Sequence, residues 1–210
     1  MKPNTRTIRS LHGATIPQQL RFGKRLRLSS LAAVACLLLF AARLPAQQSN
    51  PSEDQVKAAY LYNFGKYVKW PPASTSAQGS SFVICALGEG SLDSFMQSTL
   101  AGKTLDGKPV IVKRIAKTQE ASECRILFID AGEEKHLREI LTTLRRESVL
   151  TVSDIPDFSK RGGMIQFVLQ GSTVRFEINR ASAEGSGLIL SSELLKVAIA
   201  IRDGDQTGEQ

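Results

Sequence analysis

The sequence has no acidic residue before Glu53, although the 210-residue chain contains 20 Asp and Glu residues. Eight of its 27 Lys and Arg residues lie within the first 46 positions, so the formal net charge of +7 belongs to the N-terminus. The remainder carries 19 basic residues against 20 acidic ones, a net charge of −1. A chain with that balance has no overall electrostatic attraction for phosphate backbones or anionic lipids. The composition therefore argues against a nucleic-acid-binding protein.

Cysteine and histidine are also scarce, with three Cys and two His residues in the whole chain. After position 46 these residue types are reduced to Cys85, Cys124 and His136. Two cysteines far apart and one unassociated histidine do not give the ligand spacing of a zinc site. The Gly-x-Ser-x-Gly motif of hydrolases is absent, and a Ser-His-Asp triad would have to use His136, which lies among charged residues of a predicted helix surface. We expect no catalytic residue, no metal and no cofactor; a hydrolase that uses His136 is the enzymatic alternative.

Long apolar runs are lacking as well, because the longest, Leu31–Ala42, has only 12 residues. A run of this length is too short for a comfortable permanent membrane span. A basic segment precedes it and Pro45-Ala46 closes it, which is the order of a secretory signal peptide. We predict a signal peptide over residues 1–46. A lipoprotein cleavage site at Cys36 and an uncleaved N-terminal anchor are the alternatives, and both leave the rest of the chain on the same side of the membrane.

The remaining residues, 47–210, suffice for one domain. We divide them into a polar lead-in (47–53), an α/β domain (54–202) and a polar tail (203–210). A chain of this size buries roughly 70% of its unfolded surface, so it needs neither a structural metal nor many disulfides. Cys85 and Cys124 are a disulfide candidate in an oxidising compartment, and two buried reduced thiols are the alternative.

Hydrophobic periodicity predicts alternating strands and helices in this domain. The expected helices cover residues 53–70, 91–100, 133–146 and 192–201. The expected strands cover residues 82–87, 109–115, 124–130, 149–153, 164–169 and 173–178. Alternating strands and helices indicate parallel βαβ units, whereas the last two strands are separated only by a short turn at Gly171. We therefore predict an α/β fold: a three-layer sandwich with a mixed, mostly parallel sheet and a C-terminal β-hairpin.

The first expected helix has an apolar stripe that includes Val56, Tyr60 and Phe64 at helical spacing. Lys57 lies largely off that stripe. The helix should end at Trp70-Pro71, because proline cannot continue the hydrogen-bond ladder.

A glycine-containing turn, Leu87–Ser91, follows one expected strand and opens a helix, as a dinucleotide-binding loop does. The third glycine of that fingerprint would fall at Asp93. Glu89 and Asp93 would place carboxylates beside a pyrophosphate. We interpret the segment as a tight strand-to-helix turn.

Two features supply candidate contact residues for a partner or ligand. Arg161 precedes Gly162-Gly163, a pair that permits positive φ or a close backbone approach. Arg175, Glu177 and Asn179 alternate with apolar residues on the last strand and form its polar face. A bulge or sharp turn, and a solvated sheet face, are the structural alternatives for these two features.

Several motifs follow one another in order over residues 54–200. They are Tyr60–Pro71, Cys85–Gly88, Cys124–Ile129, Val149–Asp154, Gly162–Ile165, Val174–Asn179 and Leu188–Leu195. Together they resemble the YfiR family over nearly the whole predicted domain.

The resemblance implies a periplasmic α/β protein without catalytic activity. The family's namesake binds and represses the periplasmic sensor domain of an inner-membrane diguanylate cyclase, and an outer-membrane lipoprotein can sequester it, which raises cyclic di-GMP and biofilm formation. The namesake is a dimer that responds to redox conditions through disulfides. Cys85 and Cys124 resemble one of its cysteine pairs, and a second pair further towards the C-terminus is absent here.

The resemblance therefore implies a homodimeric regulator whose partner is a membrane diguanylate cyclase or a sensor kinase. A periplasmic small-molecule-binding sensor is the alternative function. In that case the aromatic stretch Tyr60–Trp70 and the polar row Arg175, Glu177 and Asn179 would wall the ligand pocket.

Overall fold

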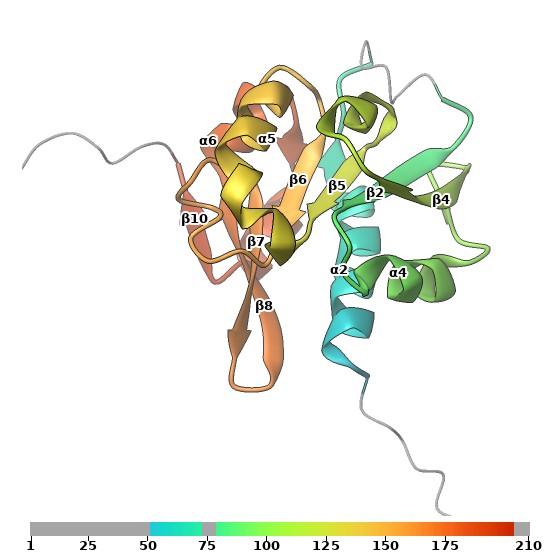
Figure 1. Ribbon diagram of the computed structural model, residues 1–210, viewed down its shortest axis with the longest axis horizontal. Coiled ribbons are helices and arrows are strands. Elements are labelled where there is room, and N and C mark those ends of the chain that lie inside the picture. The colour runs from blue at the N-terminus through green and yellow to red at the C-terminus, as the bar shows by residue number, and fades with distance from the viewer. Residues whose placement is uncertain (1–50, 73–78, 204–210) are drawn as a thin grey trace, which may run out of the picture. The chain divides into compact units, whose positions relative to one another are not determined.

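The computed structural model describes residues 51–72 and 79–203 (Figure 1). The predicted signal peptide and the larger part of both the lead-in and the tail lie outside these residues, so their boundaries stay predictions. Within the described ranges, no helix combines the length and the apolar character needed to cross a membrane.

Eight strands of the described chain form one sheet in the order β10-β8-β7-β6-β5-β2-β4-β3 (Figure 1). They are β2 (Phe82–Leu87), β3 (Thr104–Leu105), β4 (Lys108–Ile115), β5 (Ile126–Ile129), β6 (Leu150–Ser153), β7 (Ile165–Gln170), β8 (Thr173–Asn179) and β10 (Ala200–Arg202). All neighbours run parallel except the β7–β8 hairpin and the β3–β4 pair, which are antiparallel. A separate antiparallel pair joins β1 (Val68–Lys69) to β9 (Ile189–Leu190). The mixed, mostly parallel sheet and its C-terminal hairpin are thus confirmed.

Helices cover both faces of this sheet. The α-helices are α2 (Glu53–Tyr67), α4 (Leu92–Leu100), α5 (Leu137–Leu144), α6 (Arg180–Gly185) and α7 (Ser192–Val197), and the 3-10 helices are η1 (Thr118–Glu123) and η2 (Ala131–His136). A larger core lies between the sheet and α2 with α4, and a smaller core lies between the sheet and η1 with α5. Figure 1 shows α2 and α4 on the opposite side of the strands from α5. The three-layer architecture is therefore confirmed.

Strand β2 illustrates how one short apolar run serves both cores. Phe82, Ile84 and Ala86 belong to the larger core, whereas Cys85 and Leu87 belong to the smaller one. A central parallel strand is covered on both faces, which explains its continuous apolar sequence. The predicted bounds of this strand, 82–87, match the structure.

The disulfide between Cys85 and Cys124 is formed inside the smaller core. Cys85 lies on β2, and Cys124 lies between η1 and β5, the strand that pairs with β2. The two Cα atoms are 5.9 Å apart, within the usual range for a bridge. The neighbouring strands thus bring the two sulfurs together.

Three predicted helices differ from the structure at their ends. The helix expected over 53–70 ends at Tyr67, because the next two residues extend and pair with β9. The helix expected over 133–146 begins as the 3-10 turn η2 and becomes α-helical only at Leu137. The helix expected over 192–201 ends at Val197, because residues 200–202 join the sheet beside β8. In the first and third cases, pairing with a distant strand overrides local helical spacing.

Candidate functional site

The polar face of β8 does not face solvent along its whole length, because a loop at residues 155–163 covers its end. The centre of this arrangement is Ser159, which is fully buried. Its hydroxyl donates a hydrogen bond to Glu177 (2.9 Å), and its carbonyl accepts one from the side-chain amide of Asn179 (2.8 Å). Its backbone N–H donates to the side chain of Gln166 at 3.1 Å. Glu177 and Asn179 therefore hold a loop within the chain.

The same polar network reaches the edge strand and the next helix. Arg202 on β10 donates from Nε to the Ser159 hydroxyl at 3.2 Å and lies 3.4 Å from Glu177. Asn179 also accepts a hydrogen bond from the Ser182 N–H (2.9 Å) and so caps α6. Sequence reasoning missed Ser159, Gln166 and Arg202, because nothing in their local pattern indicates that they converge.

The other two predicted contact residues lie apart from this network. Arg175 is exposed on the hairpin, where it pairs in register with Val168. Arg161 is exposed in the loop after Ser159, is 2.9 Å from the Glu134 carboxylate and lines a cavity beside α5. The four candidate residues therefore do not make one surface, and a contact role for Arg161 and Arg175 stays a prediction.

The two glycines after Arg161 have the two backbone features considered from the sequence, a positive φ and a close approach to another part of the chain. Gly162 has φ +100°, a conformation that side-chain-bearing residues rarely adopt. A Cβ atom at Gly163 would overlap the ring of Phe158, which is fully buried in the smaller core. The pair thus shapes the loop that carries Arg161.

His136 lies on the surface, as predicted. Its side chain is 65% exposed, and Nδ1 lies 3.2 Å from Glu133 of the same turn. Across residues 51–72 and 79–203, no group of three or more His, Cys, Asp or Glu side chains is placed to hold a metal ion.

The turn after β2 is closed by carboxylates and an arginine. A Cβ atom at Gly90 would overlap the carboxylate of Asp130, which follows β5. Ligands of α/β proteins commonly bind at the carboxyl ends of such neighbouring strands, where the strand order reverses. Here Asp130 fills that place and would repel a pyrophosphate, which supports the interpretation of residues 87–91 as a tight turn.

Arg114 fixes the start of α4 beside this turn. Its guanidinium donates to both carboxylate oxygens of Asp93 (2.9 and 2.6 Å) and to the carbonyl of Gly90 (3.0 Å). The hydrogen bonds from Arg114 hold the pKa of Asp93 below its ordinary value and outweigh the opposing effect of burial.

We predict that Asp93→Asn lowers the free energy of unfolding by about 1–2 kcal/mol at neutral pH, because it removes a charge-assisted pair. A carboxylate whose pKa is lower in the folded state stabilises the protein above its ordinary pKa of 3.8, and this contribution is lost as the pH falls through the folded value. In urea-unfolding experiments, the difference in free energy of unfolding between wild type and Asp93→Asn should therefore become smaller as the pH is lowered from neutral to below 3.8. Glu123→Gln, which breaks an exposed pair with Lys113, is the control and should change stability by less than about 0.5 kcal/mol. An equal difference in free energy of unfolding at every pH would contradict a stabilising charge pair between Asp93 and Arg114.

Lys57 is buried, although the sequence places it largely off the apolar stripe of the first helix. It is 5% exposed, and its ammonium lies 2.6 Å from Glu53 one turn earlier and 2.6 Å from Asp154 after β6. Burial alone would lower the pKa of Lys57, but the hydrogen bonds and charges of the two carboxylates raise it. The spacing of Glu53 and Lys57 could have indicated the first contact. The contact with Asp154, 97 residues away, had no sequence signal.

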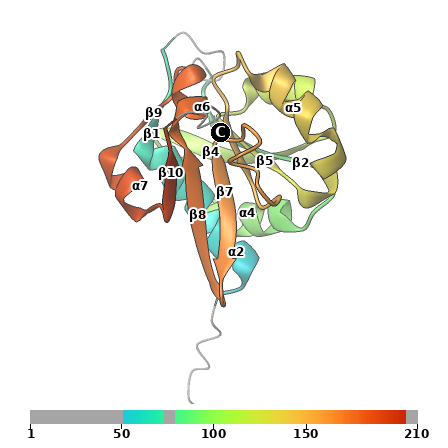
Figure 2. The ribbon, with the colours of Figure 1, turned by 90° about the vertical axis from the view of Figure 1, so that its left-hand side faces the viewer.

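Apolar side chains are exposed at one end of the sheet. They are Ile189 on β9 (64% exposed), Val197 at the end of α7 (57%) and Ile201 on β10 (41%), and we call them the edge surface. Figure 2 shows β9, α7 and β10 next to one another at this end. β10 is the outermost strand and has a sheet neighbour only on the β8 side within the described chain. Exposed apolar groups beside an open strand edge are typical of surfaces that bind another protein.

A family model described as YfiR/HmsC-like matches residues 54–199 of the chain. No curated protein matches the sequence of this chain. Among solved structures, a conserved domain protein from Vibrio cholerae O1 biovar El Tor is 11% identical with a TM-score of 0.51, and the match covers 73% of this chain and 62% of that one. An ABC domain in complex with L-Trp from Streptococcus pneumoniae is 13% identical with a TM-score of 0.46, and the match covers 71% and 60%. The chain spans about three fifths of the length of these two proteins. The likeness to the Vibrio protein concerns the fold alone, and the second likeness adds nothing to it.

Proposed function

This chain belongs to the YfiR/HmsC-like family, and from that premise we propose that it binds and represses the periplasmic sensor domain of an inner-membrane diguanylate cyclase. It is exported by its N-terminal signal peptide and acts without catalysis. Its output is a lower level of cyclic di-GMP and less biofilm. It works as a homodimer, and an outer-membrane lipoprotein can remove it from the cyclase.

The observation that carries this proposal is the edge surface. Ile201 pairs in register with Ile178, which is buried in the larger core. Partners in register project to the same face of a sheet, so Ile201 points to the face that the larger core covers. Val197 and Ile189 lie on the two elements that precede β10 in the chain. Three β-branched apolar side chains beside an open strand edge favour a protein partner.

A charged residue in the edge surface should weaken binding to the cyclase domain. We predict that Val197→Asp and Ile201→Asp each reduce the affinity at least roughly tenfold, because an unpaired carboxylate would be desolvated in the contact. The measurement is titration of the purified periplasmic domain of a candidate cyclase, with cyclic di-GMP measured in cells that carry both proteins. Ile111→Asp is the matched control, since Ile111 is 47% exposed on β4 near the opposite end of the sheet.

Unchanged affinity in both edge variants would remove the edge surface from the cyclase contact. If they instead convert a dimer to a monomer in size-exclusion chromatography and still repress the cyclase, the edge surface joins two copies of this chain. Failure of the wild-type protein to bind any periplasmic cyclase domain would contradict the proposed function itself.

The alternative small-molecule sensor is not supported by the pocket walls proposed from the sequence. Tyr60 and Phe64 pack against Phe167 in the larger core, with ring centroids about 6 Å apart. Trp70 packs edge-on against Phe82 at 5.4 Å. These aromatic side chains hold α2 and the following segment on the sheet, so they serve packing.

A further inference from the structure

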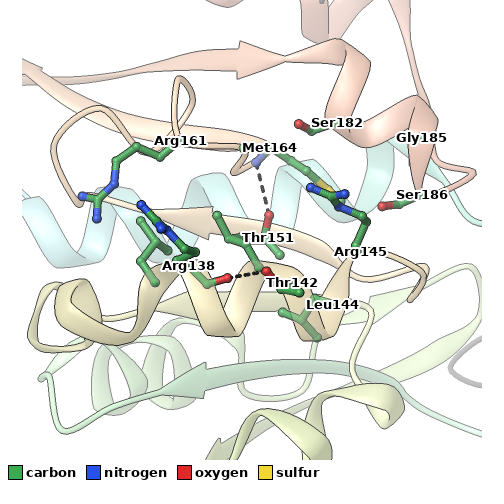
Figure 3. A pocket seen from close by; sticks show the side chains of 13 residues that line it. Arg138, Thr142, Leu144, Arg145, Thr151, Arg161, Met164, Ser182, Gly185 and Ser186 are labelled. Atoms are coloured by element: carbon green, nitrogen blue, oxygen red, sulfur yellow. Dashed lines mark hydrogen bonds between the residues drawn. The ribbon is translucent and has the colours of Figure 1, made fainter. Parts of the chain in front are cut away.

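A cavity of about 580 Å³ lies between α5, the residues before β7 and α6, and none of its lining residues belongs to the edge surface. This volume is in the range of small-molecule sites. Figure 3 shows Arg138 and Arg145 extending from α5, Arg161 entering from the loop, and Ser182 and Ser186 on the facing wall.

The lining of the cavity has charge of one sign. Three arginines contribute to it, and no Asp or Glu does. Arg161 has Glu134 as a partner, but the guanidinium groups of Arg138 and Arg145 have no ion-pair partner within the described ranges. Guanidinium groups that line a cavity and lack carboxylate partners favour an anion.

The two unpaired arginines are separated along the cavity. They are seven residues apart, which places them on the same side of α5 and its C-terminal cap, about 10 Å apart along the helix axis. Figure 3 places Arg138 with Arg161 towards one end and Arg145 with Ser186 towards the other. Between them the cavity is lined by apolar residues, including Leu141 and Met164.

We propose that this cavity binds an elongated organic dianion. One anionic group lies between Arg138 and Arg161, and the other lies at Arg145 beside the hydroxyls of Ser182 and Ser186. An apolar spacer of the ligand covers Leu141 and Met164. The site does not depend on the proposed function, because it requires neither the cyclase nor the edge surface.

The test compares three probes on the purified protein by isothermal titration calorimetry at low ionic strength. Sebacate has two carboxylates whose separation matches about seven residues of helix rise. Decanoate has the same length and one carboxylate, and succinate has two carboxylates on a short spacer. We expect saturable binding of sebacate, with roughly tenfold weaker binding of either other probe, because each loses a charge-assisted contact.

Arginine variants assign the binding to this cavity. Arg145→Gln should lower sebacate affinity to the level of decanoate, and Arg138→Gln should weaken both long probes. Arg146→Gln is the matched control, since Arg146 is an exposed neighbour on the same helix end and does not line the cavity. All three positions are exposed, so the variants should fold. Absence of saturable sebacate binding, equal affinities for sebacate and decanoate, or equal loss in the Arg146 variant would each overturn the proposal.

Discussion

Reduction of the Cys85–Cys124 disulfide is expected to lower the free energy of unfolding by about 4 kcal/mol, the loop-closure value for two residues 39 apart. The bridge restricts the unfolded chain by tying β2 to the segment before β5. Both cysteines are completely buried, so reduction also leaves two thiols in an apolar core that was packed around a bridge. The stabilisation should therefore disappear with the covalent bond, although the native strand pairing can persist.

Urea unfolding with and without a phosphine reductant measures this loss. The single tryptophan, Trp70, packs against Phe82 on β2 and reports on the same strand by fluorescence. The Cys85→Ala/Cys124→Ala double variant is the control, since its midpoint should lie near that of the reduced wild type and should not respond to the reductant. Both thiols of the wild type should resist alkylation until reduction. Free alkylation of the native protein, or a midpoint that the reductant leaves unchanged, would refute a stabilising bridge.

Burial of the bridge also bears on its use as a redox switch. A reductant can reach two fully buried sulfurs only when the smaller core opens locally. We therefore expect slow reduction of the native protein, with a rate that rises as urea increases local opening. Rapid reduction without denaturant would instead indicate a bridge that responds to the redox state around it.

The parts of the fold that sequence reasoning predicted are those whose local pattern agrees with their tertiary environment. Strand β2 was predicted to the residue because both of its faces are buried, so every position is apolar. The hairpin β7–β8 was predicted because Val174, Phe176 and Ile178 alternate with polar residues and the turn contains Gly171. Strand β10 was missed because its three residues follow a short helix and are recruited by β8, a choice that local spacing does not reveal.

The candidate site was harder to predict because its contacts join residues far apart in sequence. Lys57 looks like a solvent-facing lysine until Asp154 is placed over it. Ser159 looks like an ordinary loop serine until Glu177 and Arg202 converge on its hydroxyl. In both cases the polar side chain can be buried because a residue far away in sequence supplies its hydrogen-bond or ion-pair partner. Hydrophobicity patterns therefore do not predict that these side chains are buried.

Phe64→Ala is expected to lower the free energy of unfolding by about 3–5 kcal/mol, as for other fully buried phenylalanines. Phe64 has no exposed surface, and its ring centroid lies 5.9 Å from that of Phe167 and 5.1 Å from that of Phe176. These contacts, together with those of Tyr60, attach α2 to the β7–β8 hairpin, so the substitution removes a fully buried apolar link between the helix and that part of the sheet. Tyr67→Ala is the control on the same helix: Tyr67 is 42% exposed, and its loss should cost less than about 1 kcal/mol.

Phe64→Ala and Tyr67→Ala also distinguish effects on stability from effects on the binding of the cyclase domain and of sebacate. Neither Phe64 nor Tyr67 belongs to the edge surface, and neither lines the cavity beside α5. Under conditions where Phe64→Ala remains folded, it should therefore bind the cyclase domain and sebacate with wild-type affinity, although its urea midpoint is much lower. Equal midpoints for the Phe64 and Tyr67 variants would show that α2 is not anchored through this aromatic cluster. Loss of both binding activities in a folded Phe64 variant would show that the attachment of α2 shapes the binding surfaces as well as the core.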